Sequence, residues 1–275
     1  MLYFKVDKDL CTRCGDCAKV CYPQIIDQSQ DNLPRIRIDY ESLCQKCQHC
    51  LAVCPTAAIS IHNRAPADSI ELNDNAYPEI RKMILLVRGR RSHRYYKDQN
   101  VSTSLIGELL AAIAHAPTGN NNQRLTFIVL DDMVTMKSFQ ERMITLLSEV
   151  LGQSRQKEDW FMDNIAETLL KKGPSTIFYN APHLLIGSSP LEVFTAREDV
   201  IIALSYFDLL AQSAGLGTVW CGIAKSMMES LPELKRILNI PENHYYFPML
   251  FGLPDMQYHR TVQRDNSAEI RKVII

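Results

Sequence analysis

Two cysteine-rich runs decide how this chain folds: residues 11–21 read CTRCGDCAKVC, and residues 44–55 read CQKCQHCLAVCP. In both runs two residues separate the first three cysteines from one another, and three residues precede the fourth. Each cysteine of the first run recurs 33 positions later, Cys11 as Cys44 and Cys21 as Cys54. The runs therefore form an internal repeat that offers eight thiol groups in two quartets.

This spacing is typical of thiolates that bind two [4Fe–4S] clusters. In such sites three closely spaced cysteines hold one cluster, and the fourth cysteine of the run reaches the other cluster. On that rule we predict two crossed sets of ligands: Cys11, Cys14, Cys17 and Cys54 for one cluster, and Cys44, Cys47, Cys50 and Cys21 for the other.

Zinc and disulfide bonds are the alternatives for these cysteines. Structural zinc takes four ligands, usually from two separated Cys-x2-Cys pairs, so a triple offers one thiolate too many per turn. A disulfide framework requires an oxidising compartment, and residues 1–7 lack the basic and apolar regions of a signal peptide. We therefore predict iron–sulfur clusters in a cytoplasmic protein, where thiols stay reduced.

The cysteine region resembles the bacterial two-cluster ferredoxins at every ligand position, and Pro55 after the last cysteine fits their pattern. In the first run the proline comes one residue later, which affects no ligand. In ferredoxin-like modules the two ends pair as strands, so we expect residues 3–6 to pair with residues 59–61. A module of about 60 residues needs its clusters as staples, because its own core is small.

Length and charge limit the remaining possibilities. The 275 residues suffice for two domains, and we predict a ferredoxin-like domain at 1–63, a linker at 64–79 and a second domain at 80–275. A net charge of −1 argues against nucleic acid as the main partner. The most apolar stretch, residues 200–220, contains Asp208, so it is interpreted as a buried helix with the chain that leaves it, and not as a membrane span.

Hydrophobic periodicity predicts further elements. Ile36, Ile38 and Tyr40 alternate with polar residues, which indicates a strand between the two cysteine runs. In the second domain we expect helices from residue 80 to 89, from 102 or 103 to 116, two within 133–172, then 198–214 and 232–238, and strands at 125–130, 184–187 and 245–252.

Two polar loops mark a second site. Residues 90–94 read RRSHR, which has two interpretations: a solvated surface patch, as for most charge runs, or a phosphate clamp made by arginine forks and a serine hydroxyl. One helix later, residues 118–123 read TGNNNQ. Asn and Gln amides offer both donors and acceptors, which suits the pyrimidine edge of a flavin.

The second domain resembles the flavin-dependent nitroreductase family. Three blocks carry the resemblance: residues 90–96, residues 116–123 with Phe127, and residues 214–218 with Trp220 and Gly222. It implies an α+β fold and an obligate homodimer with FMN at its interface. It also implies FMN-binding roles for Arg90, Arg91, Ser92, Arg94, Thr118, Asn121, Gln123 and Arg260, with Gly222 as the candidate backbone donor to flavin N5.

The family often follows its glutamine with Pro-Trp, whereas this chain has Arg124-Leu125, so the pocket differs there. Residues 131–175 match no motif of the family. Gly215-Leu216-Gly217 lacks the strand–turn–helix context of a dinucleotide fingerprint. We interpret Cys221 as a buried, inert thiol and His49, His115 and His183 as residues without a catalytic or ligand role.

These features together predict an iron–sulfur flavoprotein enzyme. Its clusters pass single electrons to FMN, which reduces a nitroaromatic or another small organic acceptor, with NAD(P)H, reduced ferredoxin or reduced flavodoxin as donor. No side chain is expected to be a general acid or base. Two alternatives remain: an FMN-dependent dehydrogenase in which the clusters carry electrons away, and a non-catalytic electron carrier or redox sensor.

Overall fold

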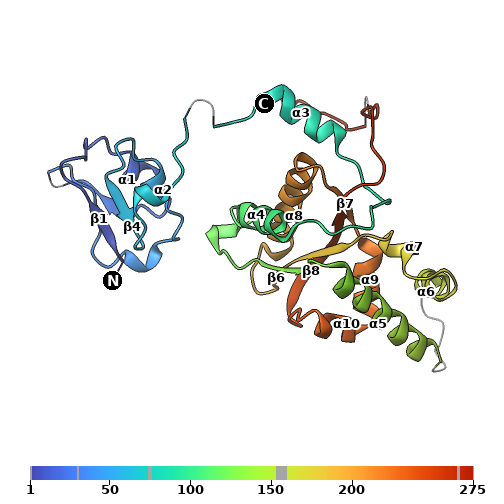
Figure 1. The fold of residues 1–275 in the computed structure, drawn as a ribbon. Helices are drawn as coiled ribbons and strands as arrows, with labels where there is room; N and C mark the ends of the chain where they lie inside the picture. The colour runs from blue at the N-terminus through green and yellow to red at the C-terminus, as the bar shows by residue number, and fades with distance from the viewer. Residues whose placement is uncertain (1, 30, 74–75, 153–159, 265–266, 275) are drawn as a thin grey trace. The chain divides into compact units, whose positions relative to one another are not determined.

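The computed structural model describes residues 2–29, 31–73, 76–152, 160–264 and 267–274. The chain divides into two compact units (Figure 1). The first comprises Met1–Pro78 together with Asn120–Asn122, and the second comprises Glu79–Gly119 and Gln123–Ile275. Each unit has buried apolar side chains of its own.

The first unit is a small module of short elements. As the sequence predicted, its ends lie side by side, because β1 (Phe4–Val6) pairs antiparallel with β4 (Ile59–Ile61). Strand β2 (Ile26–Asp27) pairs antiparallel with β3 (Arg35–Ile36). The other elements are the helices α1 (Asp16–Val20) and α2 (His49–Ala52) and the 3₁₀ turns η1 (Glu41–Leu43) and η2 (Pro66–Asp68).

Cysteines take part in the core of this module. Cys17 and Cys50 are buried together with Ile25, Leu51 and Ile59. So few apolar side chains bury little surface, and a core of this size stabilises a fold only weakly. The thiol groups therefore lie where a bound group would contribute to folding.

The strand predicted from the alternation at Ile36, Ile38 and Tyr40 is wrong beyond its first residue. Strand β3 ends at Ile36, and the side chain of Ile38 is 86% exposed. Asp39 has a φ of 69°, a left-handed conformation that an extended strand does not contain. The alternating residues belong to a turn, which shares the period of a strand without its pairing.

The second unit contains most of the regular structure. Its helices are α3 (Ile80–Gly89), α4 (Thr103–Ile113), α5 (Met133–Gly152), α6 (Trp160–Lys172), α7 (Ser175–Phe178), α8 (Ala196–Ser213), α9 (Gly222–Ser230) and α10 (Pro232–Ile237). Its strands are β5 (Thr126–Leu130), β6 (His183–Pro190), β7 (Gly217–Trp220) and β8 (His244–Gly252). The 3₁₀ turn η3 (Gly119–Asn121) begins at the last residue of Glu79–Gly119, and its other two residues are counted with the first unit.

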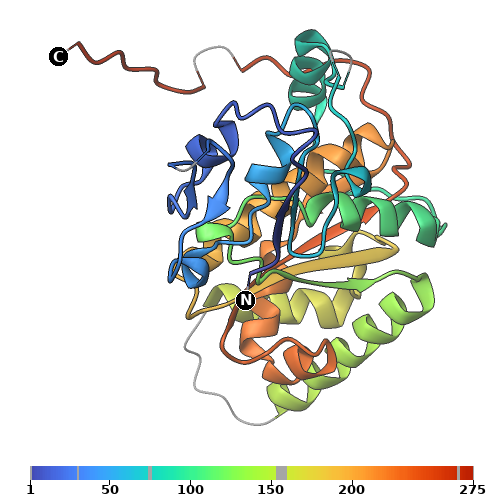
Figure 2. The ribbon, with the colours of Figure 1, turned by 90° about the vertical axis from the view of Figure 1, so that its left-hand side faces the viewer.

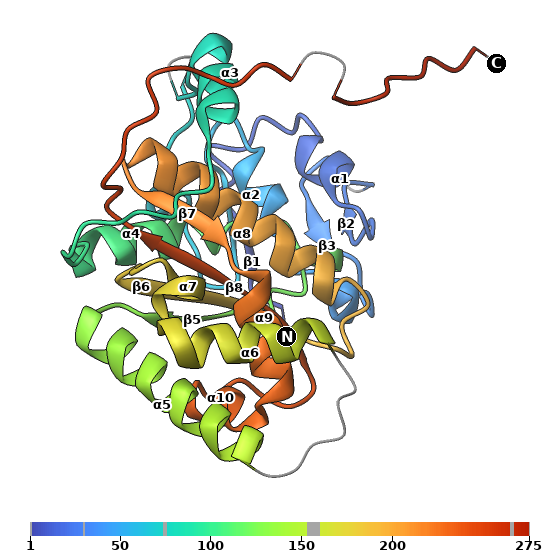
Figure 3. The same ribbon diagram turned by 90° about the vertical axis from the view of Figure 1, so that its right-hand side faces the viewer.

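These strands form one antiparallel sheet in the order β5-β6-β8-β7. Helices cover both of its faces (Figures 2 and 3). One face packs against α4 and α8, and the opposite face packs against α5, α9 and α10. The described elements thus make a mixed helix-and-sheet fold, which agrees with the predicted α+β class.

Strand β6 shows why the sheet is covered on both sides. All eight of its residues are buried. Leu184 and Ile186 pack with the side chains of α5, whereas Leu185 between them packs with those of α4 and α8. Successive side chains of a strand point to opposite faces, so a strand in the middle of a three-layer structure is apolar throughout.

No helix in the described ranges has both the length and the apolar character that crossing a bilayer requires. Helix α8, which lies on the stretch that the sequence marks as most apolar, buries Asp199 and Asp208. A buried carboxylate requires partners. Those of Asp208 lie on β7 and in the arginine loop, and Asp199 accepts from the amide loop.

Candidate functional site

The first predicted set of cluster ligands surrounds one small cavity. Cys11, Cys14, Cys17 and Cys54 all line it. The pKa of Cys17 is raised to about 11, mainly by burial and in smaller part by the neighbouring thiols of Cys14 and Cys54. Cys54, which comes from the second run, therefore lies with three cysteines of the first run, as the crossed pattern requires.

The second set is also brought together. Burial raises the pKa of Cys50 to about 12, with additional contributions from Cys47, Cys21 and Cys44. Burial likewise raises the pKa of Cys44, and Cys47 and Cys21 add to the shift. Iron is bound by thiolates, so a cluster bound by these cysteines would release the protons of their thiols.

In the part of the chain that the structure describes, no three His, Cys, Asp or Glu side chains converge as one metal ion would require. A cubane presents a separate iron to each of its four cysteines, so its ligands surround a volume and not a point. The first quartet lines such a volume and the second quartet is gathered together, so both donor sets fit [4Fe–4S] clusters.

The backbone repeats itself along with the cysteines. Left-handed conformations recur 33 positions apart, at Arg13 and Lys46 with φ of 62° and 54° and at Gln24 and Ala57 with φ of 53° and 55°. Gly15 has a φ of 87°, and its counterpart Gln48 has a φ of 59°. Such conformations cost a non-glycine residue roughly 1–2 kcal/mol, and both halves of the repeat adopt them at corresponding positions.

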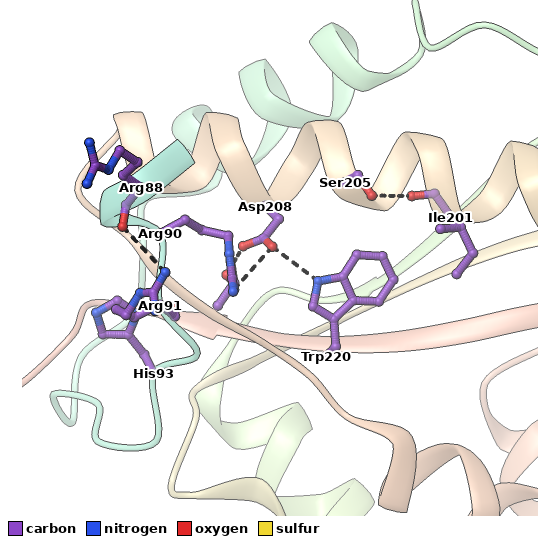
Figure 4. A network of polar contacts seen from close by, with 9 residues as sticks. Arg88, Arg90, Arg91, His93, Ile201, Ser205, Asp208 and Trp220 are labelled. Atoms are coloured by element: carbon purple, nitrogen blue, oxygen red, sulfur yellow. Dashed lines mark hydrogen bonds and ion pairs between the residues drawn. The ribbon is translucent and has the colours of Figure 1, made fainter. Parts of the chain in front are cut away.

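In the second unit, Asp208 of α8 organises the arginine loop (Figure 4). Its carboxylate is buried and accepts hydrogen bonds from the Thr218 hydroxyl and from Trp220 Nε1, the latter at 3.1 Å. Arg90 Nη1 lies 3.5 Å from Asp208 Oδ2, which makes an ion pair. At this distance Nη1 still has no hydrogen-bond acceptor among the described residues.

The guanidinium of Arg91 also has a hydrogen-bond donor that is not used within the described part of the chain. Its Nη2 donates to the carbonyl of Arg88 at 3.4 Å, whereas its buried Nε has no partner among the described residues. Burial and the nearby charges of Arg264 and Arg90 lower the pKa of Arg91. Such mutual repulsion between cations would be relieved by a bound anion.

Backbone contacts hold this loop against strand β7. Ser92 forms a bridge with Thr218, and the His93 backbone N–H donates to the Thr218 carbonyl at 2.9 Å. A Cβ on Gly217 would lie 2.5 Å from the His93 ring, so the close approach requires glycine. Arg94 is exposed and its guanidinium stacks over Tyr179, 5.7 Å from the ring centre.

The amide loop is anchored by the other buried aspartate of α8. The Gly119 backbone N–H donates to Asp199 Oδ1 at 3.0 Å. Thr118 Oγ1 accepts from the Gln123 backbone N–H at 3.1 Å, and the Gln123 side chain is exposed. Asn121 belongs to the first unit, where its Nδ2 donates to the Gln45 carbonyl at 2.8 Å.

The two remaining predicted residues lie elsewhere in the second unit. Gly222 is the first residue of α9, where its N–H has no acceptor within the helix, and its surroundings are open. Arg260 is exposed. Arg264, four residues further along the C-terminal tail, is the tail residue whose charge adds to the effect of burial in lowering the pKa of Arg91.

Residues 87–253 match the model of the nitroreductase family. This chain belongs to that family. Residues 10–58 of the same nitroreductase-family chain match the model of a 4Fe-4S dicluster domain. The order of the two domains, the iron–sulfur domain first, agrees with the sequence prediction.

Curated relatives match about two thirds of this nitroreductase-family chain. An Archaeoglobus fulgidus protein whose name includes "NAD(P)H nitroreductase" is 25% identical over 190 residues, which cover 68% of this chain and 95% of the relative. A Staphylococcus haemolyticus protein named "NADPH-dependent oxidoreductase" is 26% identical over 216 residues, covering 69% and 77%.

A solved structure shows the same fold. The Bacteroides fragilis nitroreductase with bound FMN has a TM-score of 0.55 at 19% identity, covering 69% of this chain and 99% of its own. A Desulfitobacterium hafniense nitroreductase with bound FMN has a TM-score of 0.52 at 19% identity, covering 69% and 98%.

The sequence reading of this nitroreductase-family chain missed three residues that the structure places at the sites: Asp199, Asp208 and His62. The two aspartates had a usable signal, because a carboxylate in an otherwise apolar helix needs a buried partner. His62, which lies beside Cys44, had none. Two other residues considered from the sequence lie in the interior: Cys221 is buried with its pKa raised to about 11, and buried His183 accepts from the Val101 N–H at 2.9 Å.

Proposed function

We propose that this chain is an iron–sulfur flavoprotein oxidoreductase. In this proposal two [4Fe–4S] clusters pass electrons to FMN for the reduction of a nitroaromatic or another small organic acceptor. The observation that carries the proposal is the presence, in one chain, of a nitroreductase-family domain and two quartets of gathered thiols. The names of both curated relatives favour NAD(P)H as a reductant, and reduced ferredoxin or flavodoxin is the other donor to be tested.

Buried donors without acceptors support an FMN site in the second unit. Arg90 Nη1 and Arg91 Nε are both buried and lack hydrogen-bond acceptors among the described residues. Arginine forks suit phosphate oxygens, so these two residues would hold the FMN phosphate or ring edge with Ser92 between them. Arg94, which stacks on Tyr179, and Arg260, which is exposed, would have to turn to join them.

The amide loop would hold the pyrimidine edge of the ring. Asp199 fixes the loop at Gly119, and the Gln123 side chain is exposed and available. Thr118 acts as a brace for Gln123, because its hydroxyl already accepts from that backbone N–H. The free N–H of Gly222 would be the donor to flavin N5. FMN supplies the ability to store two electrons that arrive singly and to deliver them together.

Helix α3 supports the homodimer. None of its residues is buried, although several of them are large and apolar. The side chains of Ile80, Ile84, Leu85 and Val87 are 71%, 47%, 62% and 56% exposed. An apolar helix face left in water is unfavourable and typical of a surface that meets a partner. We propose that a second copy covers α3, and that FMN lies at this homodimer interface.

Cofactor analysis after anaerobic purification tests the proposal. We expect about eight irons, the content of two cubanes, with one FMN per chain. The flavin is then reduced with NADH, NADPH, reduced ferredoxin and reduced flavodoxin in turn, and nitroarene consumption is followed. A protein without iron or with zinc in its place, or one without flavin, would contradict the proposal.

The same experiment separates the other functions. Flavin that is reduced only by organic substrates, with electrons leaving through the clusters, would identify a dehydrogenase. A loaded protein that turns over none of the acceptors would identify an electron carrier or sensor. Either result would replace the reductase proposal.

A further inference from the structure

One histidine of the first unit contacts a predicted cluster ligand. His62 follows β4, and its Nε2 lies 3.5 Å from Cys44 Sγ. A cysteine bound to iron has lost its proton and can only accept a hydrogen bond, so Nε2 would be the donor in the loaded protein. The contact therefore depends on the clusters of the proposed function, and on nothing in the flavin site.

The backbone holds His62 in this place at a cost. His62 and Asn63 have φ of 53° and 58°, in the left-handed region. The His62 N–H donates to the Tyr3 carbonyl at 3.0 Å, and Ile61 and Arg64 exchange two backbone hydrogen bonds across the turn. A non-glycine residue in this conformation costs roughly 1–2 kcal/mol, and such positions cluster at functional sites.

The internal repeat provides a built-in comparison. The counterpart of Cys44 is Cys11, and the counterpart of His62 is Ser29, whose hydroxyl donates to Asp27 at 2.5 Å. The nearby cation is the same in both halves, because Lys46 corresponds to Arg13. The imidazole contact is thus a difference between the two halves, whereas the charge at that position is shared.

The other set of ligands has different donors. Cys54 Sγ accepts from the Ala58 backbone N–H at 3.2 Å and lies 3.8 Å from Thr56 Oγ1. Hydrogen bonds to the sulfurs set the reduction potential of an iron–sulfur cluster. One electron enters on reduction and no bond forms or breaks, so a donor stabilises the added negative charge and raises the potential.

We propose that His62 raises the reduction potential of the cluster held by Cys44, Cys47, Cys50 and Cys21, and thereby makes the two clusters of the repeat unequal. The imidazole is a tuning residue: it contacts a ligand and does not itself bind iron. Electrons entering the module would then favour this cluster more than they would without the imidazole, whichever donor supplies them.

Anaerobic redox titration of the full-length, loaded protein tests this, with dithionite as reductant and electron paramagnetic resonance to resolve the clusters. His62→Asn keeps a residue that tolerates the left-handed backbone but is too short to reach the sulfur. We expect the reduced-to-oxidised ratio of one cluster to fall about tenfold at fixed potential, equivalent to about 59 mV, while the other cluster is unchanged. His62→Gln places an amide N–H near the position of Nε2 and should restore most of the shift.

His49→Gln is the matched control, because this exposed histidine adjoins the ligand Cys50 without a role in the proposal. Unchanged potentials in His62→Asn, an equal shift of both clusters, or the same shift in His49→Gln would refute the inference. If His62→Asn fails to assemble one cluster, the wild-type protein with ring-15N histidine decides. Hyperfine coupling of a ring nitrogen to a reduced cluster is expected, and its absence would refute the contact.

The iron count distinguishes the failure of this inference from the failure of the proposed function. A chain without clusters refutes both. Eight irons with potentials independent of His62 refute only the tuning role.

Discussion

Removing the Asp208 carboxylate should destabilise the second unit strongly. In Asp208→Ala the Thr218 hydroxyl and the Trp220 indole lose their acceptor, and Arg90 loses its counter-charge. Breaking a buried charged pair by removing one partner costs about 3–5 kcal/mol. In a domain of this size each kcal/mol lowers Tm by about 2–4 °C, so a fall of roughly 6–20 °C is expected.

Asp208→Asn separates the charge from the hydrogen bonds. The asparagine oxygen can accept from Trp220, and its amide can donate to the Thr218 hydroxyl, so the network keeps its connections. Hydrogen bonds to a charged acceptor exceed neutral ones by about 1 kcal/mol each, which predicts a cost of about 2 kcal/mol for this variant.

The assay is thermal unfolding followed by near-ultraviolet circular dichroism, with flavin content measured on the same samples. Ser205→Ala is the matched control on the same helix, because the Ser205 hydroxyl donates only to the Ile201 carbonyl one turn away (Figure 4). Its Tm should change little, since such substitutions usually stay within about 0.5 kcal/mol. An Asp208→Ala protein as stable as Ser205→Ala would refute the reasoning about the network.

Three further predictions concern the second unit. Gly217→Ala should lower the free energy of unfolding by about 1–3 kcal/mol, because the new methyl group would overlap the buried His93 imidazole. Gly107→Ala, in open space on α4, should raise it by about 0.5–1 kcal/mol. Urea unfolding measures both changes. Burial lowers the pKa of His183, so its contribution to stability is complete above the unfolded value of about 6.5 and is lost as pH falls toward the folded-state pKa. Tm should therefore drop between pH 7.5 and 5.5, and less steeply in His183→Gln; equal slopes would contradict this. Arg91→Gln should weaken FMN binding about 10- to 100-fold in a fluorescence titration, the effect of one charged hydrogen bond, and unchanged affinity would remove Arg91 from the site.

The sequence predicted those parts of the molecule that depend on local spacing. The eight cysteines were found from their repeat, and helices such as α3 and α10 from their hydrophobic periodicity. Strand β7 was missed because it begins at Gly217, in a glycine-rich stretch that normally ends an element. Helix α9 follows directly and was missed with it.

Partners distant in sequence could not be predicted where neither the repeat nor a family resemblance supplied them. Asp208 meets Thr218 and Arg90 only because α8 packs beside β7 and the end of α3, and nothing in the sequence of α8 names those partners. His62 meets Cys44 only because β4 pairs with β1 and the chain then turns sharply. Both contacts arise from tertiary structure, which periodicity does not describe.

The left-handed positions that recur between Arg13 and Ala57 have a consequence for how this module can change over evolutionary time. Each one is a fixed joint at a fixed count of residues from a cysteine. Adding or deleting a single residue between these positions would change their spacing from the cysteines. Many substitutions of one side chain for another would leave that spacing intact. Homologues of the first unit should therefore differ by substitutions and rarely by insertions or deletions.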